Sequence, residues 1–228
     1  MKRIFILLFV LFNIAPILQA QQNPEEKLGA WYSVFSNHKI SKKWKIYNEI
    51  NLNLYETTSD LDQFWVITGL QRSFKKGVTA SLGYGYFYTD PTYDIGTSDE
   101  LFGENRIFEQ FAFNQEYGKL KMQHRYRMEH RIFDPEVNNV VIHRFRYRLA
   151  IVYPFIEKWF IQAFDEVFLN FNKNTFNQNR LVCNLGYKIL PNMDFRLGYM
   201  KLHTATNKFD RLLMTINFSL DWTPTEIN

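Results

Sequence analysis

Polar and apolar side chains alternate along most of this chain with a period of two residues. The pattern is clearest in two neighbouring stretches, Leu120–Arg131 and Val140–Leu149. In both, charged residues occupy one parity, while leucine, methionine, aromatic residues and histidine occupy the other. Successive side chains of a strand point to opposite faces. Each stretch therefore predicts a strand with one strongly charged face and one apolar, aromatic face.

The same alternation predicts strands along the rest of the chain. The expected strands are 28–38, 44–56, 63–74, 78–88, 106–116, 120–131, 140–149, 159–171, 180–189, 193–202 and 209–222. The count is odd, whereas single-chain bacterial barrels have even numbers of strands. We therefore expect ten to twelve strands, with a partial first strand, one wrong assignment or an unusual closure as the explanations for the odd count.

The connections between these strands alternate in kind. Short connections, most of them with lysine, fall at 39–43, 75–77, 117–119, 154–158 and 190–192. Longer polar connections fall at 57–62, 89–105, 132–139, 172–178 and 203–208. Outer-membrane barrels show this asymmetry, with short periplasmic turns and longer outside loops. The pattern indicates an all-β, antiparallel, up-and-down barrel with no second domain.

The orientation of the two faces separates a membrane barrel from a soluble one. A soluble barrel buries its apolar face, while a membrane barrel turns that face toward lipid and keeps polar side chains inside. The expected strands of roughly 10–13 residues suit a tilted membrane span. Tyrosine, tryptophan and histidine near the strand ends suit the two interfaces. We therefore predict a transmembrane barrel; the alternative is a soluble periplasmic lipid-binding barrel.

The N-terminus predicts export. Lys2 and Arg3 precede an apolar segment that ends at Leu18, followed by Ala20 at a cleavage position, so residues 1–20 read as a secretory signal peptide. The expected organisation is then a polar leader over 21–27, a barrel over 28–222 and a tail over 223–228. The chain has 27 basic and 23 acidic residues. When Lys2 and Arg3 are removed with the signal peptide, basic residues exceed acidic ones by only two. This near-neutral balance, with no basic block, gives no indication of nucleic-acid binding.

Several motifs resemble those of one known family. They are HRYRMEHR (124–131), HRFRYRL (143–149), DEVFLN (165–170), NRLVCNLGYKI (179–189) and LGYM (197–200). Their order and spacing resemble the bacterial outer-membrane β-barrel family catalogued as domain of unknown function 2490. The resemblance spans roughly residues 30–222 and implies a barrel in the outer membrane of a Gram-negative bacterium. It implies no catalytic residue.

The charged parity supplies the candidate site, a network of side chains inside the barrel. Its members are Glu49, Arg106, Arg125, Arg127, Glu129, Arg131, Arg144, Arg146, Arg148, Glu166, Arg180 and Arg196, with Glu116, Asp194 and Arg211 on the same faces. One interpretation is a packed electrostatic network, because buried charges must be paired. The other is an anion-selective path, because arginine outnumbers carboxylate and binds phosphate and carboxylate in a bidentate manner.

Enzymatic chemistry has weaker support. His130 and His143 lie on the apolar parity near an expected outside loop, and a lipid hydrolase or acyltransferase would need a nucleophile beside them. The acidic loop 89–105 could hold Ca²⁺ but lacks ordered ligand spacing. Cys183 is expected to pack against lipid. We expect no enzyme activity and no cofactor; the expected partners are outer-membrane lipid, the barrel-insertion machinery and a small anionic solute.

Overall fold

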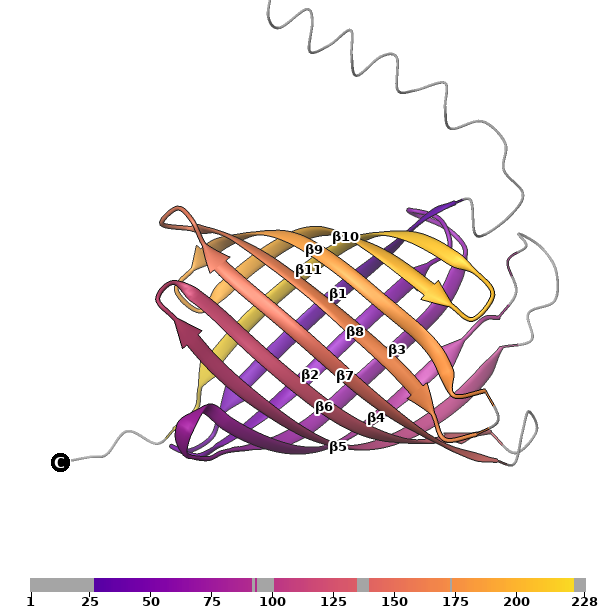
Figure 1. Ribbon diagram of the computed structural model, residues 1–228, viewed down its shortest axis with the longest axis horizontal. Coiled ribbons are helices and arrows are strands. Elements are labelled where there is room, and N and C mark those ends of the chain that lie inside the picture. Colours follow the sequence, from indigo (N-terminus) through magenta and orange to yellow (C-terminus); the bar gives the residue numbers. More distant parts are fainter. Residues whose placement is uncertain (1–26, 92, 94–100, 135–139, 173, 224–228) are drawn as a thin grey trace, which may run out of the picture.

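The structure, a computed structural model, describes residues 27–91, 93, 101–134, 140–172 and 174–223. These residues form a closed barrel of eleven tilted strands (Figure 1). The strands are β1 (Leu28–Lys39), β2 (Trp44–Leu54), β3 (Leu61–Ser73), β4 (Val78–Thr89), β5 (Phe102–Tyr117), β6 (Leu120–Phe133), β7 (Val141–Pro154), β8 (Trp159–Asn170), β9 (Phe176–Leu190), β10 (Met193–Thr204) and β11 (Lys208–Asp221). In the part of the chain described, no helix is long and apolar enough to cross a membrane.

The expected β-barrel and its strand count are confirmed, but the closure is not antiparallel. Ten neighbouring pairs are antiparallel hairpins, whereas β1 and β11 pair in parallel, from Leu28 opposite Asp210 to Lys39 opposite Asp221. The cause is the odd number: strands that alternate in direction return to the starting direction at the eleventh. Of the explanations considered for the odd count, the unusual closure is the correct one.

The two ends of the barrel differ in connection length and in charge. Figure 1 shows the short connections, which include the 3-10 turn η2 (Lys75–Gly77), at the left end and the longer ones at the right. The short connections between strands contain six lysines and one glutamate. The described residues of the longer connections include four acidic residues and no lysine. The barrel is therefore positive at its short-turn end and negative at its long-loop end.

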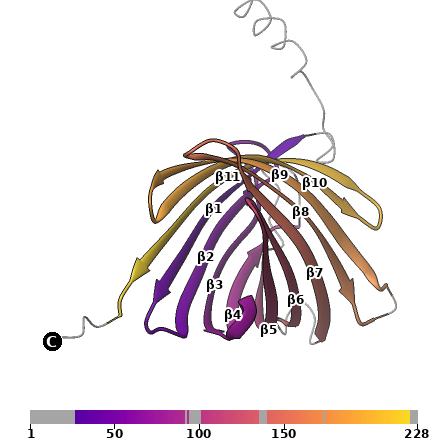
Figure 2. The same cartoon turned by 60° about the vertical axis from the view of Figure 1, so that its left-hand side comes forward.

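Apolar side chains face outward over the strands. Outward leucines remain widely exposed, with 59% of Leu82 and 56% of Leu181 accessible, and Phe111 is similar at 54%. Exposed aromatic residues, among them Trp44 and Trp159, lie beside the short turns. Figure 2, turned from the first view, shows the strands forming one continuous curved wall. The molecule thus carries an extended apolar surface of a kind that monomeric soluble proteins rarely expose.

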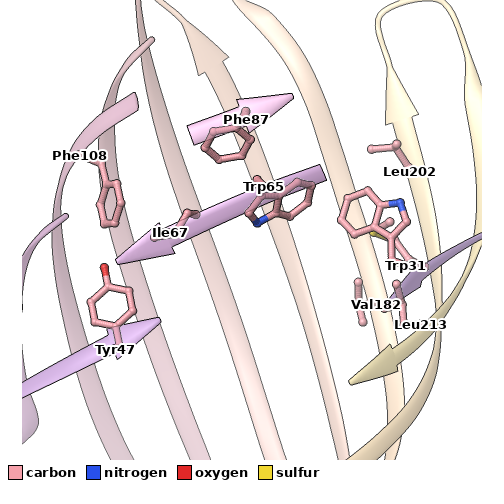
Figure 3. Packing of buried hydrophobic residues seen from close by; sticks show 10 residues of the cluster. Trp31, Tyr47, Trp65, Ile67, Phe87, Phe108, Val182, Leu202 and Leu213 are labelled. Atoms are coloured by element: carbon pink, nitrogen blue, oxygen red, sulfur yellow. The ribbon is translucent and has the colours of Figure 1, made fainter. Parts of the chain in front are cut away.

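The interior holds a cluster of apolar side chains beside the charged ones. Trp31 of β1 and Trp65 of β3 meet edge to face at 5.6 Å between ring centroids, and Trp65 stacks on Phe87 of β4 at 5.4 Å (Figure 3). Phe108 lies over the inner face of β4, where a Cβ on Gly83 would stand 2.2 Å from the ring. The small residues that alternate along β4 therefore make room for aromatic rings from its neighbours.

Two strand boundaries differ from the sequence-based expectation in a way that matters for the site. β5 begins at Phe102 rather than at Arg106, so the connection expected over 89–105 is shorter. β9 begins at Phe176 rather than at Arg180. Both strands extend toward the long-loop end because their polar residues there face inward and fit the same two-residue period. The extension of β5 moves Glu104 from an expected loop into the barrel interior.

Candidate functional site: an arginine-lined cavity

A cavity of about 590 Å³ occupies the barrel interior. Its walls include ten arginines, which come from β5, β6, β7, β9, β10 and β11, and only three acidic residues, Glu49, Asp62 and Glu166. Its volume lies within the ~300–1,000 Å³ range that is typical of small-molecule sites. Glu104, Glu129 and Asp194, which do not line the cavity, pair with five of these arginines. The lining therefore combines ligand-scale space with an excess of arginine that is partly neutralised from behind.

Arg146 links two buried carboxylates at the centre of the network. Its Nη1 donates to Glu129 Oε1 at 2.5 Å, and its Nε donates to Glu166 Oε1 at 2.9 Å. Arg144 stands opposite Glu129 across the β6–β7 pair and donates to Oε2 from Nε at 2.8 Å and from Nη2 at 2.6 Å. Arg125 Nη2 donates to Glu166 at 2.5 Å. Such charge-assisted bonds fix the side chains in one arrangement.

Glu104 is the member of the network that sequence reasoning assigned to a loop. Its side chain has no accessible surface, and it receives two hydrogen bonds of 2.8 Å from Arg106 and two of 2.8 Å from Arg131. The signal was present in the sequence, because Glu104 shares the parity of Arg106 two residues later. The run of acidic residues before it hid the start of the strand.

Other members of the expected set lie on the cavity wall with weaker partners. Arg127 donates to Gln110 at 2.9 Å and lies 3.8 Å from Glu49. Arg196 pairs with Asp194 at 2.7 Å and also donates to Gln162 at 2.8 Å. These contacts place the expected residues inside the barrel, with one exception.

The exception is Glu116, which the alternation had placed with the interior set. Its side chain is 68% exposed at the short-turn end, 3.6 Å from Lys121. Its parity is that of the inward-facing residues of β5. At this position, however, β5 extends beyond the end of a neighbouring strand, so the side chain is exposed. Periodicity reports the face of a strand and not how far along the barrel a residue lies.

Several guanidinium atoms on the cavity wall lack a hydrogen-bond partner. Within the described residues, this holds for Nε of Arg125, Arg148 and Arg211, and the Arg211 residue is only 1% exposed. Arg180 has no carboxylate bonded to it in the described part of the chain; it lies 4.6 Å from the ring centroids of both Trp31 and Phe168. Nε and Nη2 of Arg180 donate to the side-chain oxygen of Gln178 at 3.0 and 2.7 Å. The unpartnered Nε atoms have almost no accessible surface, so they lie behind the surface that a ligand would meet, and a buried donor without an acceptor is costly.

A second polar group lies on the outward surface. His130 Nδ1 and His143 Nδ1 are 2.7 Å apart, and His130 Nε2 lies 3.1 Å from Glu109 Oε2. Within the described residues, neither imidazole hydrogen-bonds a hydroxyl or thiol, and no three His, Cys, Asp or Glu side chains gather as metal ligands. Cys183, on the outward face of β9, is exposed. Glu109, His130 and His143 therefore form an outward row that provides a base and an orienting carboxylate but no bonded nucleophile.

The long-loop end carries a third cluster. Lys27 Nζ donates to Glu56 at 3.0 Å, and the Tyr93 hydroxyl donates to the same carboxylate at 2.8 Å. The hydrogen bonds from Tyr93 and Lys27 hold the pKa of Glu56 below its ordinary value. This contact fastens the start of β1 to two connections. The acidic loop 89–105, considered for Ca²⁺, includes Asp94, Asp99 and Glu100, which lie outside the described residues.

The geometry can be set beside known proteins. A family model described as Protein of unknown function (DUF2490) matches residues 28–212. The chain belongs to this family. The match begins with the first residue of β1 and ends within β11, so the DUF2490 region is nearly the whole barrel. Comparison with curated proteins found no significant match.

Proposed function

We propose that this DUF2490 chain is an outer-membrane β-barrel whose interior cavity binds a small anionic solute. The observation that carries the anion part is the lining of the cavity, with ten arginines against three acidic residues. In this proposal the chain binds and holds a solute and performs no catalytic step. Its other partners are membrane lipid and the machinery that inserts barrels.

The membrane part is supported by the distribution of side chains. Arg146 and Glu129 are buried inside the barrel, while residues such as Leu82 and Leu185 are exposed outside. A soluble lipid carrier would require the opposite arrangement, with apolar side chains inside and charged ones in water. The sequence adds the expected signal peptide.

Extraction of the membrane fraction with alkaline carbonate tests the location. An integral barrel stays with the membrane because its outward leucines and aromatic residues lie in hydrocarbon. Quantitative release as a soluble monomer would contradict the proposal and favour the soluble lipid-binding barrel.

Reconstitution in a planar bilayer tests how the interior works. The network around Arg146 and Glu129 joins β6, β7 and β8, and Arg127 of β6 lies 3.8 Å from Glu49 of β2, so these side chains narrow the lumen and we expect little steady conductance from the wild type. Phosphate added to the folded protein should change the fluorescence of Trp31 and Trp65, which line the cavity. A large, anion-selective conductance would instead indicate that the barrel is an open pore for anions rather than a binding protein. Absence of any anion effect would contradict the binding proposal.

A lipid-modifying enzyme is the second candidate. The hydrogen-bonded row of Glu109, His130 and His143 favours it, because a carboxylate that orients an imidazole is a common arrangement for a general base. The absence of a bonded hydroxyl among the described residues argues against it. Hydrolysis of membrane phospholipid by the purified wild type would promote this candidate.

A further inference from the structure

The cavity has two chemically different walls. Arginines such as Arg125 and Arg148 come from β6 and β7. Apolar side chains such as Trp31 and Leu213 come from β1 and β11. In the order of strands around the barrel, β6 and β7 lie half a circuit away from β1. A ligand in this space would therefore meet positive charge on one side and an apolar surface on the other.

The apolar wall consists of side chains from distant parts of the sequence. Figure 3 shows Trp31 beside Trp65, with Val182, Leu202 and Leu213 close to Trp31. All five are among the residues that line the cavity. A cavity built only to hold an inorganic ion would gain nothing from an aromatic and aliphatic wall, since water against such a wall is unfavourable.

The size of the cavity points in the same direction. At about 30 Å³ for each molecule in the liquid, its 590 Å³ corresponds to roughly twenty waters. A single phosphate or sulfate would fill a small part of that space. An anion with an apolar body would fill more of it and would displace the water that lies against the apolar wall.

Two of the lining arginines, Arg180 and Arg211, lie beside aromatic rings. Arg211 is 1% exposed, its Nε has no partner among the described residues, and its guanidinium lies 4.8 Å from the ring centroid of Phe209. Arg180 lies 4.6 Å from the ring of Trp31. Positive charge is thus held beside aromatic rings, although Nε and Nη2 of Arg180 donate to the side-chain oxygen of Gln178 at 3.0 and 2.7 Å.

We propose that the cavity selects organic anions in which a carboxylate or phosphate is attached to an aromatic or aliphatic body. The anionic group would lie against the guanidinium groups of lining arginines such as Arg125 and Arg148, and the body would lie on the wall formed by Trp31, Val182, Leu202 and Leu213. This inference rests on the proposed anion-binding function and narrows its ligand class.

Tryptophan fluorescence provides a direct readout. The chain has five tryptophans, and Trp31 and Trp65 are the two that line the cavity. The variant Trp44→Phe/Trp159→Phe/Trp222→Phe removes the signal from outside the cavity. This protein, folded in phosphatidylcholine nanodiscs, is titrated with acetate, phenylacetate and hexanoate, and with inorganic phosphate and phenyl phosphate. Empty nanodiscs correct for partition of the ligands into lipid.

We expect phenylacetate and phenyl phosphate to bind at least about tenfold more tightly than acetate and inorganic phosphate, because each buries an apolar body. Hexanoate distinguishes an aliphatic body from an aromatic one. If hexanoate binds more tightly than acetate while phenylacetate does not, the cavity selects aliphatic anions. Equal affinities for the bare and the substituted anions would overturn this inference and leave the anion-binding function in place. Absence of binding by every anion would overturn both.

Two variants assign the walls. Leu213→Gln should reduce the ratio of phenylacetate to acetate affinity toward one while acetate still binds. Arg148→Gln, on the arginine wall, should weaken the binding of all five ligands. If Leu213→Gln leaves the ratio unchanged, the wall is structural and the inference fails. Heat-modifiable migration on a gel checks that each variant is folded, and Leu213→Ala replaces Leu213→Gln if the latter does not fold.

Discussion

Gly83 of β4 lies directly opposite Phe108 of β5, and the ring of Phe108 occupies the space that a side chain on Gly83 would take. A Cβ on Gly83 would stand 2.2 Å from Cζ of the ring. Phe108 itself is fully buried. The absence of a side chain at one position is therefore a condition for the aromatic packing at the other.

This relationship predicts the effect of Gly83→Ala. The added methyl group should destabilise the barrel by about 1–3 kcal/mol, as overpacking does. The urea midpoint of the protein in detergent measures the loss. Phe108→Leu in the same chain should recover part of it, with a coupling of about 0.5–3 kcal/mol between the two sites. Strictly additive effects would show that the loss caused by Gly83→Ala does not arise from contact with Phe108.

The buried carboxylate of Glu129 predicts a larger effect. Glu129→Gln leaves Arg144 and Arg146 without their shared counter-charge. Removal of one partner of a buried ion pair typically costs about 3–5 kcal/mol, and the urea midpoint should fall accordingly. Glu116→Gln is the matched control, because Glu116 is 68% exposed and should change the midpoint little. Equal effects of the two substitutions would mean that the network does not stabilise the barrel.

The Glu56 cluster predicts a pH dependence at the long-loop end. Hydrogen bonds from Tyr93 and Lys27 lower the pKa of Glu56 in the folded protein from its ordinary value of 4.5. The stabilisation is therefore fully present above pH 4.5 and is lost as the pH falls through the lower, folded value. The difference in urea midpoint between the wild type and Glu56→Gln should be constant near neutral pH and should close below pH 4.5. A difference that persists at lower pH would contradict a charge effect.

The outward histidine pair predicts a negative result that separates binding from catalysis. We expect His130→Gln and His143→Gln to leave the phospholipid composition of reconstituted vesicles unchanged, as we expect for the wild type. Mass spectrometry of the lipids after prolonged incubation measures this. Hydrolysis by the wild type that disappears in either variant, with heat-modifiable folding retained, would identify the Glu109–His130–His143 row as catalytic.

The sequence predicts the barrel because a period of two persists over nearly every strand. Parity also places Glu129 on the same face as Arg144 and Arg146, and the register of the hairpin selects Arg144 as the residue directly opposite. It does not reveal the role of Glu104, because local acidic composition outweighs parity at the start of β5. The apolar wall of the cavity is also hidden, since Trp31, Trp65 and Leu213 meet only through the three-dimensional closure of the barrel. Parity gives the face of each strand, whereas the height and the neighbours of a side chain depend on register.

The parallel pairing of β1 with β11 has a consequence for how the chain is threaded. Because both strands run in the same direction, Lys27 lies at the long-loop end and Thr223 follows β11 at the short-turn end. In a membrane the two termini of such a barrel are on opposite sides, whereas a barrel with an even number of strands returns its last residue to the side of its first. If the short turns of the proposed outer-membrane barrel face the periplasm, Lys27 lies on the cell-surface side and Thr223 on the periplasmic side. An epitope fused before Lys27 would then be reached by antibody on intact cells, and one fused after Thr223 only after the outer membrane is opened.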